Sequence, residues 1–299
     1  MPYDFDLDAD VIQMYEKREA RSIDESILSS KIKKIIESTD SASKFLYSSD
    51  DIERIAANHV LLSDDIGAET PSFAKISHVT FVTGCYTLKL ADRYYIFEPC
   101  IKRMFDMTEK ETKQCVKIHD QYFDSNHETM LNQSYDQANV AENINIDKDL
   151  DQINRALDDY IHAMNVVERG FPLLLAVKRV FENGKMPELD ELQNMRLSKI
   201  QTELTDDSTQ AYPYFDLIAE AVDTDLRNAV AHGDVFTDPK KSKVHIENKN
   251  IDYTFPEVVE KIKDIMSVNV FLGNTFQSTV PLSIVIQKTD LTTTGILVD

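Results

Sequence analysis

Three polar side chains with complementary chemistry stand close together in the stretch "DTDLRNAVAHGDVF", residues 223–236. The arginine, Arg227, carries a planar fork of hydrogen-bond donors that suits phosphate oxygens. The imidazole of a histidine, here His232, can act as a general acid or a general base. The amide of Asn228 can orient a phosphate or an imidazole. Together the three residues have the chemistry needed to bind a phosphate and to move protons beside it.

An amphipathic helix is expected to position these residues, from about Pro213 to His232. Its apolar residues recur at helical spacing: Phe215, Ile218, Ala219, Val222, Leu226, Ala229 and Val230. Asn228 and His232 are four residues apart and project from the same side, while Arg227 lies at the border of the polar face. Gly233 fits the position after the last turn, where a left-handed backbone ends a helix.

A purely structural interpretation explains part of the same pattern. A histidine in the last turn is favoured by the helix dipole and can bond the terminal carbonyls. Arg227 can pair with Asp223 one turn earlier, a surface contact worth about 0.3–0.5 kcal/mol. On spacing alone, both interpretations stay open.

The segment "LRNAVAHG" resembles the motif of the HEPN family, the higher eukaryotes and prokaryotes nucleotide-binding domains. That motif has an arginine, commonly followed by a polar residue and then, a few positions later, by a histidine. Arg227, Asn228 and His232 occupy these positions. The resemblance covers about residues 149–277, where a long amphipathic helix precedes the motif and a last helix follows it.

The resemblance implies a helical bundle that forms a homodimer in which two copies of the motif face each other. Catalytic HEPN proteins are metal-independent endoribonucleases, among them toxins and defence effectors. Carried over to this chain, the resemblance implies that Arg227 binds the phosphate, His232 acts in acid–base catalysis and Asn228 assists them. RNA would be the substrate, and a protein antitoxin or regulator would be a further partner.

The alternative is a non-catalytic HEPN-like dimerising module that binds a nucleotide or a protein partner. The charge of the chain favours it, because 52 acidic residues against 32 basic ones give a formal net charge of -20. Such a surface repels nucleic acid at long range, so we expect no DNA partner. A basic surface around His232 would favour the enzyme, and an acidic one would favour the module.

Other site types have weaker signals. Cys115 and His119 have the spacing of half a metal site, but no second pair accompanies them, so we expect neither a metal nor a cofactor. The three cysteines do not make a disulfide framework in a chain of 299 residues. No signal peptide and no apolar run long enough to span a membrane is visible, so we expect a cytoplasmic protein without a membrane partner.

Composition predicts a mainly α fold, because the chain has only 7 glycines and 9 prolines. We divide it into a mostly helical N-terminal region of unknown role (1–135), the HEPN-like bundle (149–277) and a C-terminal tail (278–299). Residues 132–149 are expected to form an exposed linker. A small β-hairpin is expected in "KVHIENKNIDYTF", just after the motif helix.

Further helices follow from local signals. A long helix beginning at Leu150 is expected to end at Gly170 and Pro172, with a second, shorter apolar helix after it. Another is expected from about Pro187 to Leu204. Helix starts with capping-box spacing are found at three pairs: Ser22 with Glu25, Thr108 with Glu111, and Thr254 with Glu257. Residues 51–62 are expected to be helical, and 71–105 are either β-structure or a buried helix.

Overall fold

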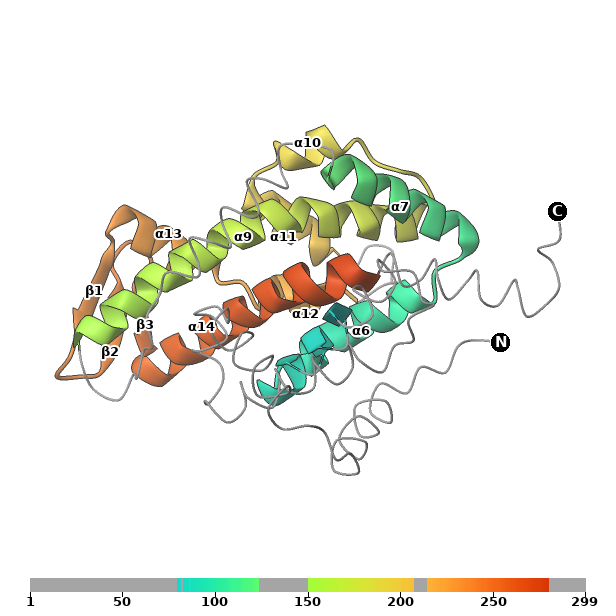
Figure 1. Cartoon of the computed structure of the whole chain (residues 1–299). Helices are drawn as coiled ribbons and strands as arrows, with labels where there is room; N and C mark the ends of the chain where they lie inside the picture. The colour runs from blue at the N-terminus through green and yellow to red at the C-terminus, as the bar shows by residue number, and fades with distance from the viewer. Residues whose placement is uncertain (1–79, 82, 86, 124–149, 207–213, 280–299) are drawn as a thin grey trace, which may run out of the picture.

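The structure is a computed structural model that describes residues 80, 81, 83–85, 87–123, 150–206 and 214–279. These residues form mainly α-helices with one small antiparallel sheet (Figure 1), which confirms the expected fold class. The expectations for the helix after Ser22, for residues 51–62, for the linker 132–149 and for nearly all of the C-terminal tail lie outside the described residues. Among the described residues, no helix is long and apolar enough to cross a membrane.

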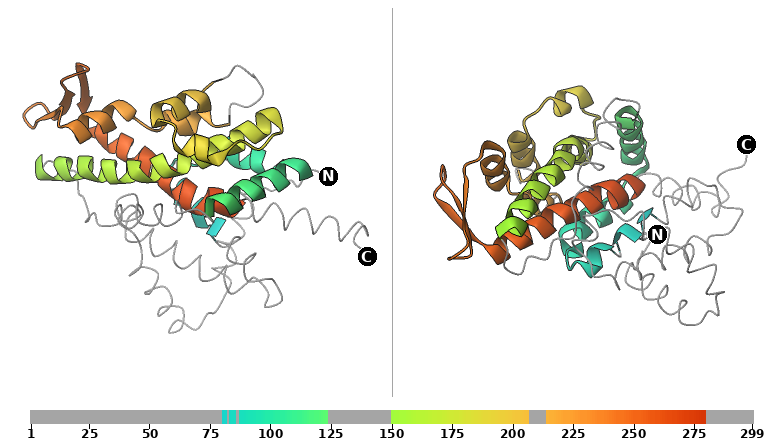
Figure 2. Two further views of the ribbon diagram at one scale, coloured as in Figure 1. Left: turned by 90° about the horizontal axis from the view of Figure 1, so that it is seen from above. Right: turned by 60° about the vertical axis from the view of Figure 1, so that its left-hand side comes forward.

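Helix α9 (Leu150–Asn183) is the central element, and α14 (Phe255–Val270) runs beside it in every view (Figures 1 and 2). The helices α6 (Tyr94–Phe105) and α7 (Glu109–Phe123) come before α9 in the chain. Four short helices lie between α9 and the sheet in sequence: α10 (Leu189–Gln193), α11 (Leu197–Leu204), α12 (Asp216–Glu220) and α13 (Thr224–His232). A π-helical segment, η1 (Phe271–Phe276), continues α14.

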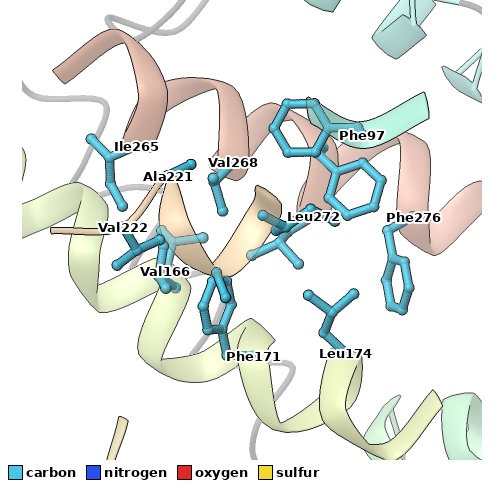
Figure 3. Close-up of a cluster of buried hydrophobic side chains, with 14 of the residues drawn as sticks. Phe97, Val166, Phe171, Leu174, Ala221, Val222, Ile265, Val268, Leu272 and Phe276 are labelled. Atoms are coloured by element: carbon cyan, nitrogen blue, oxygen red, sulfur yellow. The ribbon is translucent and has the colours of Figure 1, made fainter. Parts of the chain in front are cut away.

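A single cluster of buried apolar side chains joins these helices. Figure 3 shows its centre, where Phe171 of α9 and Leu272 of η1 lie between the ribbons of α9 and α14, with Val222 nearby. Helices α6 and α7 contribute to the same cluster, and Phe97 of α6 stacks on Phe271 at a centroid distance of 4.6 Å. The helices before and after the expected linker therefore share one hydrophobic core.

The expected end of a helix at Gly170 and Pro172 is wrong, since α9 continues through both residues to Asn183. Every residue from Gly170 to Lys178 is buried, so neighbouring helices surround this part of α9 and support it despite the proline. The glycine has a packing role instead, because a Cβ at Gly170 would lie 2.7 Å from Leu272 Cδ1. Gly170 thus permits the close approach of α9 and η1.

Two helices that were expected to be continuous are each divided into two. The helix expected over 187–204 is broken between Gln193 and Leu197, giving α10 and α11. The helix expected over 213–232 is broken between Glu220 and Thr224, giving α12 and α13. The apolar stripe of the second pair is nevertheless buried as expected, except for Val230, which is half-buried.

Several local predictions are confirmed. Glu111 and Thr108 form the expected capping box, and so do Thr254 and Glu257 at the start of α14. Gly233 ends α13 with φ 74°, in the left-handed region that favours glycine. The described part of 71–105 is helical except for a turn at 91–93, so the choice left open there falls to helix.

The expected hairpin forms from β2 (Lys243–Ile246) and β3 (Ile251–Thr254). A strand that was not expected, β1 (Val235–Asp238), pairs antiparallel with β2, so the sheet has the order β1-β2-β3. The sheet follows the motif helix α13 directly and leads into α14. It therefore fixes the C-terminal end of the motif helix relative to the rest of the bundle.

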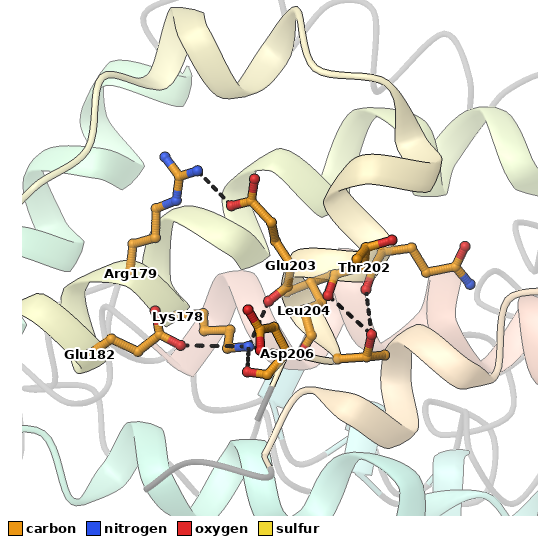
Figure 4. Close-up of polar contacts among 9 residues, drawn as sticks. Lys178, Arg179, Glu182, Thr202, Glu203, Leu204 and Asp206 are labelled. Carbon is orange, nitrogen blue, oxygen red and sulfur yellow. Dashed lines mark hydrogen bonds and ion pairs between the residues drawn. The ribbon is translucent and has the colours of Figure 1, made fainter. Parts of the chain in front are cut away.

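A buried lysine holds α11 against α9 (Figure 4). Lys178 is 2% exposed, and its ammonium donates to the carbonyl oxygens of Glu203, Leu204 and Asp206 at 2.6, 2.9 and 3.1 Å. These carbonyls lie at and just after the C-terminal end of α11, where backbone acceptors lack helical partners. The lysine satisfies them and so ties the C-terminal end of α11 to α9.

The buried stripe of the motif helix generates a stability prediction. Leu226 is fully buried, so Leu226→Ala should lower the free energy of unfolding by about 2–5 kcal/mol. Leu217→Ala is the matched control, because Leu217 lies on the neighbouring helix α12 and is 40% exposed. A denaturant titration measures both. Equal losses for the two variants would contradict the packing described for α13.

Candidate functional site

The motif helix α13 begins at a capping carboxylate, Asp223. Its Oδ1 accepts a hydrogen bond from the backbone N–H of Leu226 at 2.9 Å, as expected of an N-cap. Its Oδ2 accepts one from the hydroxyl of Tyr253 on β3 at 2.8 Å and lies 3.5 Å from the ammonium of Lys261 on α14. One side chain therefore joins the start of the motif helix to the sheet and to α14.

The backbone of Asp223 is tied to α9 through Tyr160. The hydroxyl of Tyr160 donates to the carbonyl oxygen of Asp223 and accepts from its N–H, both at 3.0 Å. Burial, with the nearby charge of Asp223, raises the pKa of Tyr160, and burial and the bond to Asp223 raise the pKa of Tyr253. Both phenols consequently stay protonated at neutral pH and keep donating to Asp223.

Arg227 makes its ion pair with Glu168 of α9. The structural interpretation of the sequence had Asp223 as its partner, and that expectation is wrong. The capping and tyrosine bonds already occupy the Asp223 carboxylate, which is why it does not face Arg227. A second nitrogen of the same guanidinium donates to Asn228 Oδ1 at 2.9 Å. The structure thus brings Arg227 and Asn228 together and fixes the orientation of the guanidinium from two sides.

These two residues form part of the wall of a pocket of about 500 Å³. Three elements line it: α9, the turn from α10 into α11, and the first turns of α13. Its lining residues are Glu168, Arg169, Gln193, Asn194, Met195, Arg196, Leu197, Ser198, Thr224, Arg227 and Asn228. Three arginines and one glutamate are among the residues that line the pocket, so its lining carries an excess of positive charge in a chain that is strongly acidic overall.

His232 lies apart from this pocket. It is exposed in the last turn of α13 and is not among the lining residues. Gly233, which follows it, has nothing within 4 Å of the position that a Cβ would take. Within one chain, the structure therefore assembles two of the three motif residues and leaves the histidine open at the end of the helix.

Sequence reasoning missed the other charged residues of the pocket. Glu168 and Arg169 interrupt an apolar run from Val166 to Val177, and this interruption was the available signal. From the sequence alone, the same residues indicate the end of a helix, because Gly170 and Pro172 follow directly. Arg196 belongs to no sequence motif that could have indicated it. It reaches the pocket because the expected helix is broken between α10 and α11.

The weaker metal candidate has a structural explanation. Cys115 is buried in the hydrophobic core, and burial raises the pKa of its thiol to about 12. Its burial among apolar side chains explains this cysteine as part of the core. In the described part of the chain, no group of three or more His, Cys, Asp or Glu residues could hold a metal ion.

The capping role of Asp223 generates the prediction for this site. Asp223→Ala removes the N-cap and leaves the Tyr253 hydroxyl without its acceptor, so it should lower the free energy of unfolding by about 1–3 kcal/mol. Asp225→Ala, two residues along the same helix, removes an exposed pair with Lys249 and should cost only about 0–1 kcal/mol. Thermal and denaturant unfolding of both variants measure the difference. A cost for Asp223→Ala no larger than that for Asp225→Ala would contradict its anchoring role.

Comparison with protein-family models, with curated proteins and with solved structures finds no match to this chain. The resemblance of the motif helix to HEPN sequences therefore stays a prediction.

Proposed function

We propose that this chain is a metal-independent endoribonuclease of HEPN type, in which Arg227, Asn228 and His232 act on RNA. The observation that supports the proposal most is the positive charge of the pocket beside the motif helix. A chain with a net charge of -20 has no general reason to gather three arginines around one concave surface. Local charge of this sign is what an enzyme needs to draw a phosphodiester to its site.

The chemistry of the proposal uses the 2′-OH of RNA as the nucleophile. A base removes the proton of the 2′-OH, its oxygen attacks phosphorus, and the bond from phosphorus to the 5′-oxygen breaks as that oxygen takes up a proton. Arg227 offers two donors to the non-bridging oxygens, where negative charge builds up. A histidine can remove the proton of the 2′-OH or protonate the departing 5′-oxygen at neutral pH. We propose that His232 acts in these proton transfers.

The position of His232 leads us to propose a shared site. His232 lies outside the pocket that Arg227 and Asn228 line. We therefore propose that the histidine of a second copy of the chain transfers protons at the reacting phosphate. A two-fold homodimer with the exposed ends of α13 facing each other supplies two arginines and two histidines to one cleft. Within this arrangement, Glu168 keeps Arg227 oriented toward the pocket through their ion pair.

The wider biology follows from the resemblance alone. We propose a toxin or defence effector that acts in the cytoplasm and has a protein antitoxin or regulator as its partner. The thiols of Cys85, Cys100 and Cys115 are free and buried, which suits a reducing compartment.

The second candidate is a non-catalytic dimerising module that binds a nucleotide or a protein partner. Two observations favour it: the overall acidity of the chain, and the ion pair with Glu168 that already neutralises Arg227. It differs from the first candidate in one respect that can be measured, since it binds without cutting. RNA left intact by the purified protein under every condition tried would support this module.

The proposal predicts cleavage of mixed RNA by the purified protein in the presence of EDTA. His232→Ala should lower the rate about 10²–10⁴-fold, as expected for the loss of a positioned acid–base group. His245→Ala is the matched control, because His245 is bound to Asp252 on the sheet and belongs to no part of the proposed site. Arg227→Lys should also be slow, since an ammonium keeps the charge but loses the two-pronged geometry.

The cleavage assay is read by gel electrophoresis, with circular dichroism to show that each variant is folded. A requirement for Mg²⁺, or full activity of His232→Ala, would contradict the proposal.

The shared site predicts a homodimer, and an exposed aromatic residue provides a way to test its orientation. Phe236 on β1 is 61% exposed and follows the end of the motif helix, so we expect it at the interface. Phe236→Asp should shift the protein from dimer to monomer in light scattering at micromolar concentration. Tyr95→Asp changes an equally exposed aromatic residue on α6 and should leave the dimer intact. A monomeric wild-type protein would rule out the shared site.

A further inference from the structure

Two arginines of the pocket, Arg169 and Arg196, lie outside the motif and take no part in the proposed chemistry. Arg169 belongs to α9, and Arg196 is the residue just before α11. Neither guanidinium has an ion pair with another residue in the described part of the chain, in contrast to Arg227, which pairs with Glu168. We infer that the pocket is a binding subsite for a phosphate group, with Arg169 and Arg196 as its principal ligands.

Several groups in the lining of the pocket can donate hydrogen bonds to a ligand. Besides the arginines, the side-chain amide nitrogen of Gln193 is buried and has no hydrogen-bond partner among the described residues. Helix α11 begins at the same place without a side-chain cap, so the pocket also meets the positive end of that helix. The carboxylate in the wall, Glu168, already accepts from Arg227. A ligand that supplies acceptors and negative charge is what such a lining would recognise.

The size of the pocket indicates more than a lone ion. Its volume of about 500 Å³ lies within the range of about 300–1,000 Å³ that is typical of small-molecule sites. A nucleotide unit fits this range, with its phosphate on the two arginines. Phosphate also explains the choice of arginine, whose planar fork binds two oxygens of one group at once.

The subsite adds a binding site for a second phosphate to the proposed function. Only the assignment of that phosphate to RNA rests on the proposed function. Arg227 and Asn228 line the same pocket. A strand whose reacting phosphate lies on Arg227 would therefore place a neighbouring phosphate near Arg169 and Arg196. The recognition of phosphate itself does not depend on cleavage, and a free nucleotide offers the same chemistry.

The test measures binding separately from cutting. The probe is a fluorescent 2′-O-methyl RNA hexamer, which lacks the nucleophile and cannot be cleaved through its 2′-oxygen, and binding to the full chain is measured by anisotropy. Arg169→Gln and Arg196→Gln should each weaken binding about tenfold, as the loss of a charged hydrogen bond predicts. Each should also reduce the slope of log affinity against log salt by about 1.

Lys199→Gln is the matched control. Lys199 is an exposed cation on α11 that does not line the pocket, so this variant should bind like the wild type. Circular dichroism establishes that all three variants are folded. A second arm titrates adenosine monophosphate by calorimetry: variant-dependent binding of the mononucleotide identifies a free nucleotide as a ligand, and binding of the hexamer alone identifies the RNA strand.

The two proposals fail in different ways. Wild-type affinity and salt slope in both arginine variants would overturn the subsite, and so would the absence of binding to either probe by the wild type. RNA cleavage at the wild-type rate and KM by the double variant would overturn the placement of an RNA phosphate on these two arginines, while leaving the proposed enzyme in place. Binding that depends on both arginines, in a protein that leaves RNA intact, would support the subsite and contradict the proposed enzyme.

Discussion

The carboxylate of Asp223 is the contact on which the geometry of the site depends. It caps α13, accepts from Tyr253 of β3 and lies beside Lys261 of α14, while its backbone bonds Tyr160 of α9. Three other elements, α9, β3 and α14, are therefore fixed relative to the first turn of the motif helix. A helix of nine residues is marginal on its own, so its position must come from such contacts. Asp223 positions Arg227 indirectly, through the helix that it starts.

The distribution of charge is the second constraint. A strongly acidic surface keeps nucleic acid at a distance, whereas a pocket with excess positive charge attracts it locally. Glu168 moderates this pocket by pairing with Arg227, which limits the free charge to Arg169 and Arg196. Such an arrangement favours a ligand that can enter the pocket over one that contacts only the outer surface. It reconciles the acidity of the whole chain with the proposed phosphate site.

Features determined by neighbouring residues were predictable from the sequence. The capping boxes at Thr108 and Thr254 and the helix end at Gly233 each depend on a few adjacent positions, and all three are present. The apolar stripe through Leu226 was predictable for the same reason, because helical periodicity is a local pattern.

Features that depend on tertiary contacts were not predictable in this way. Pro172 is a local helix-breaking signal, but α9 continues through it because neighbouring helices bury every residue of α9 from Gly170 to Lys178. The helix expected over 213–232 is interrupted before Thr224, where Asp223 bonds Tyr160 and Tyr253. These two tyrosines come from other elements, so the interruption could not be predicted from neighbouring residues. The pocket could not be read from the sequence either, as it needs the break before Arg196 and the charged pair within α9 to meet in space.

The central claim is that the motif residues cut RNA through its own 2′-oxygen, and the ends of the products test it most directly. Mass spectrometry of a short RNA, cut by the wild-type protein in EDTA, identifies these ends. The account predicts a 2′,3′-cyclic phosphate on one fragment and a 5′-hydroxyl on the other, and no cut where the nucleotide before the bond is a deoxynucleotide. Fragments with a 3′-hydroxyl and a 5′-phosphate would mean that water attacks phosphorus instead, and would contradict the role given to Arg227 and His232.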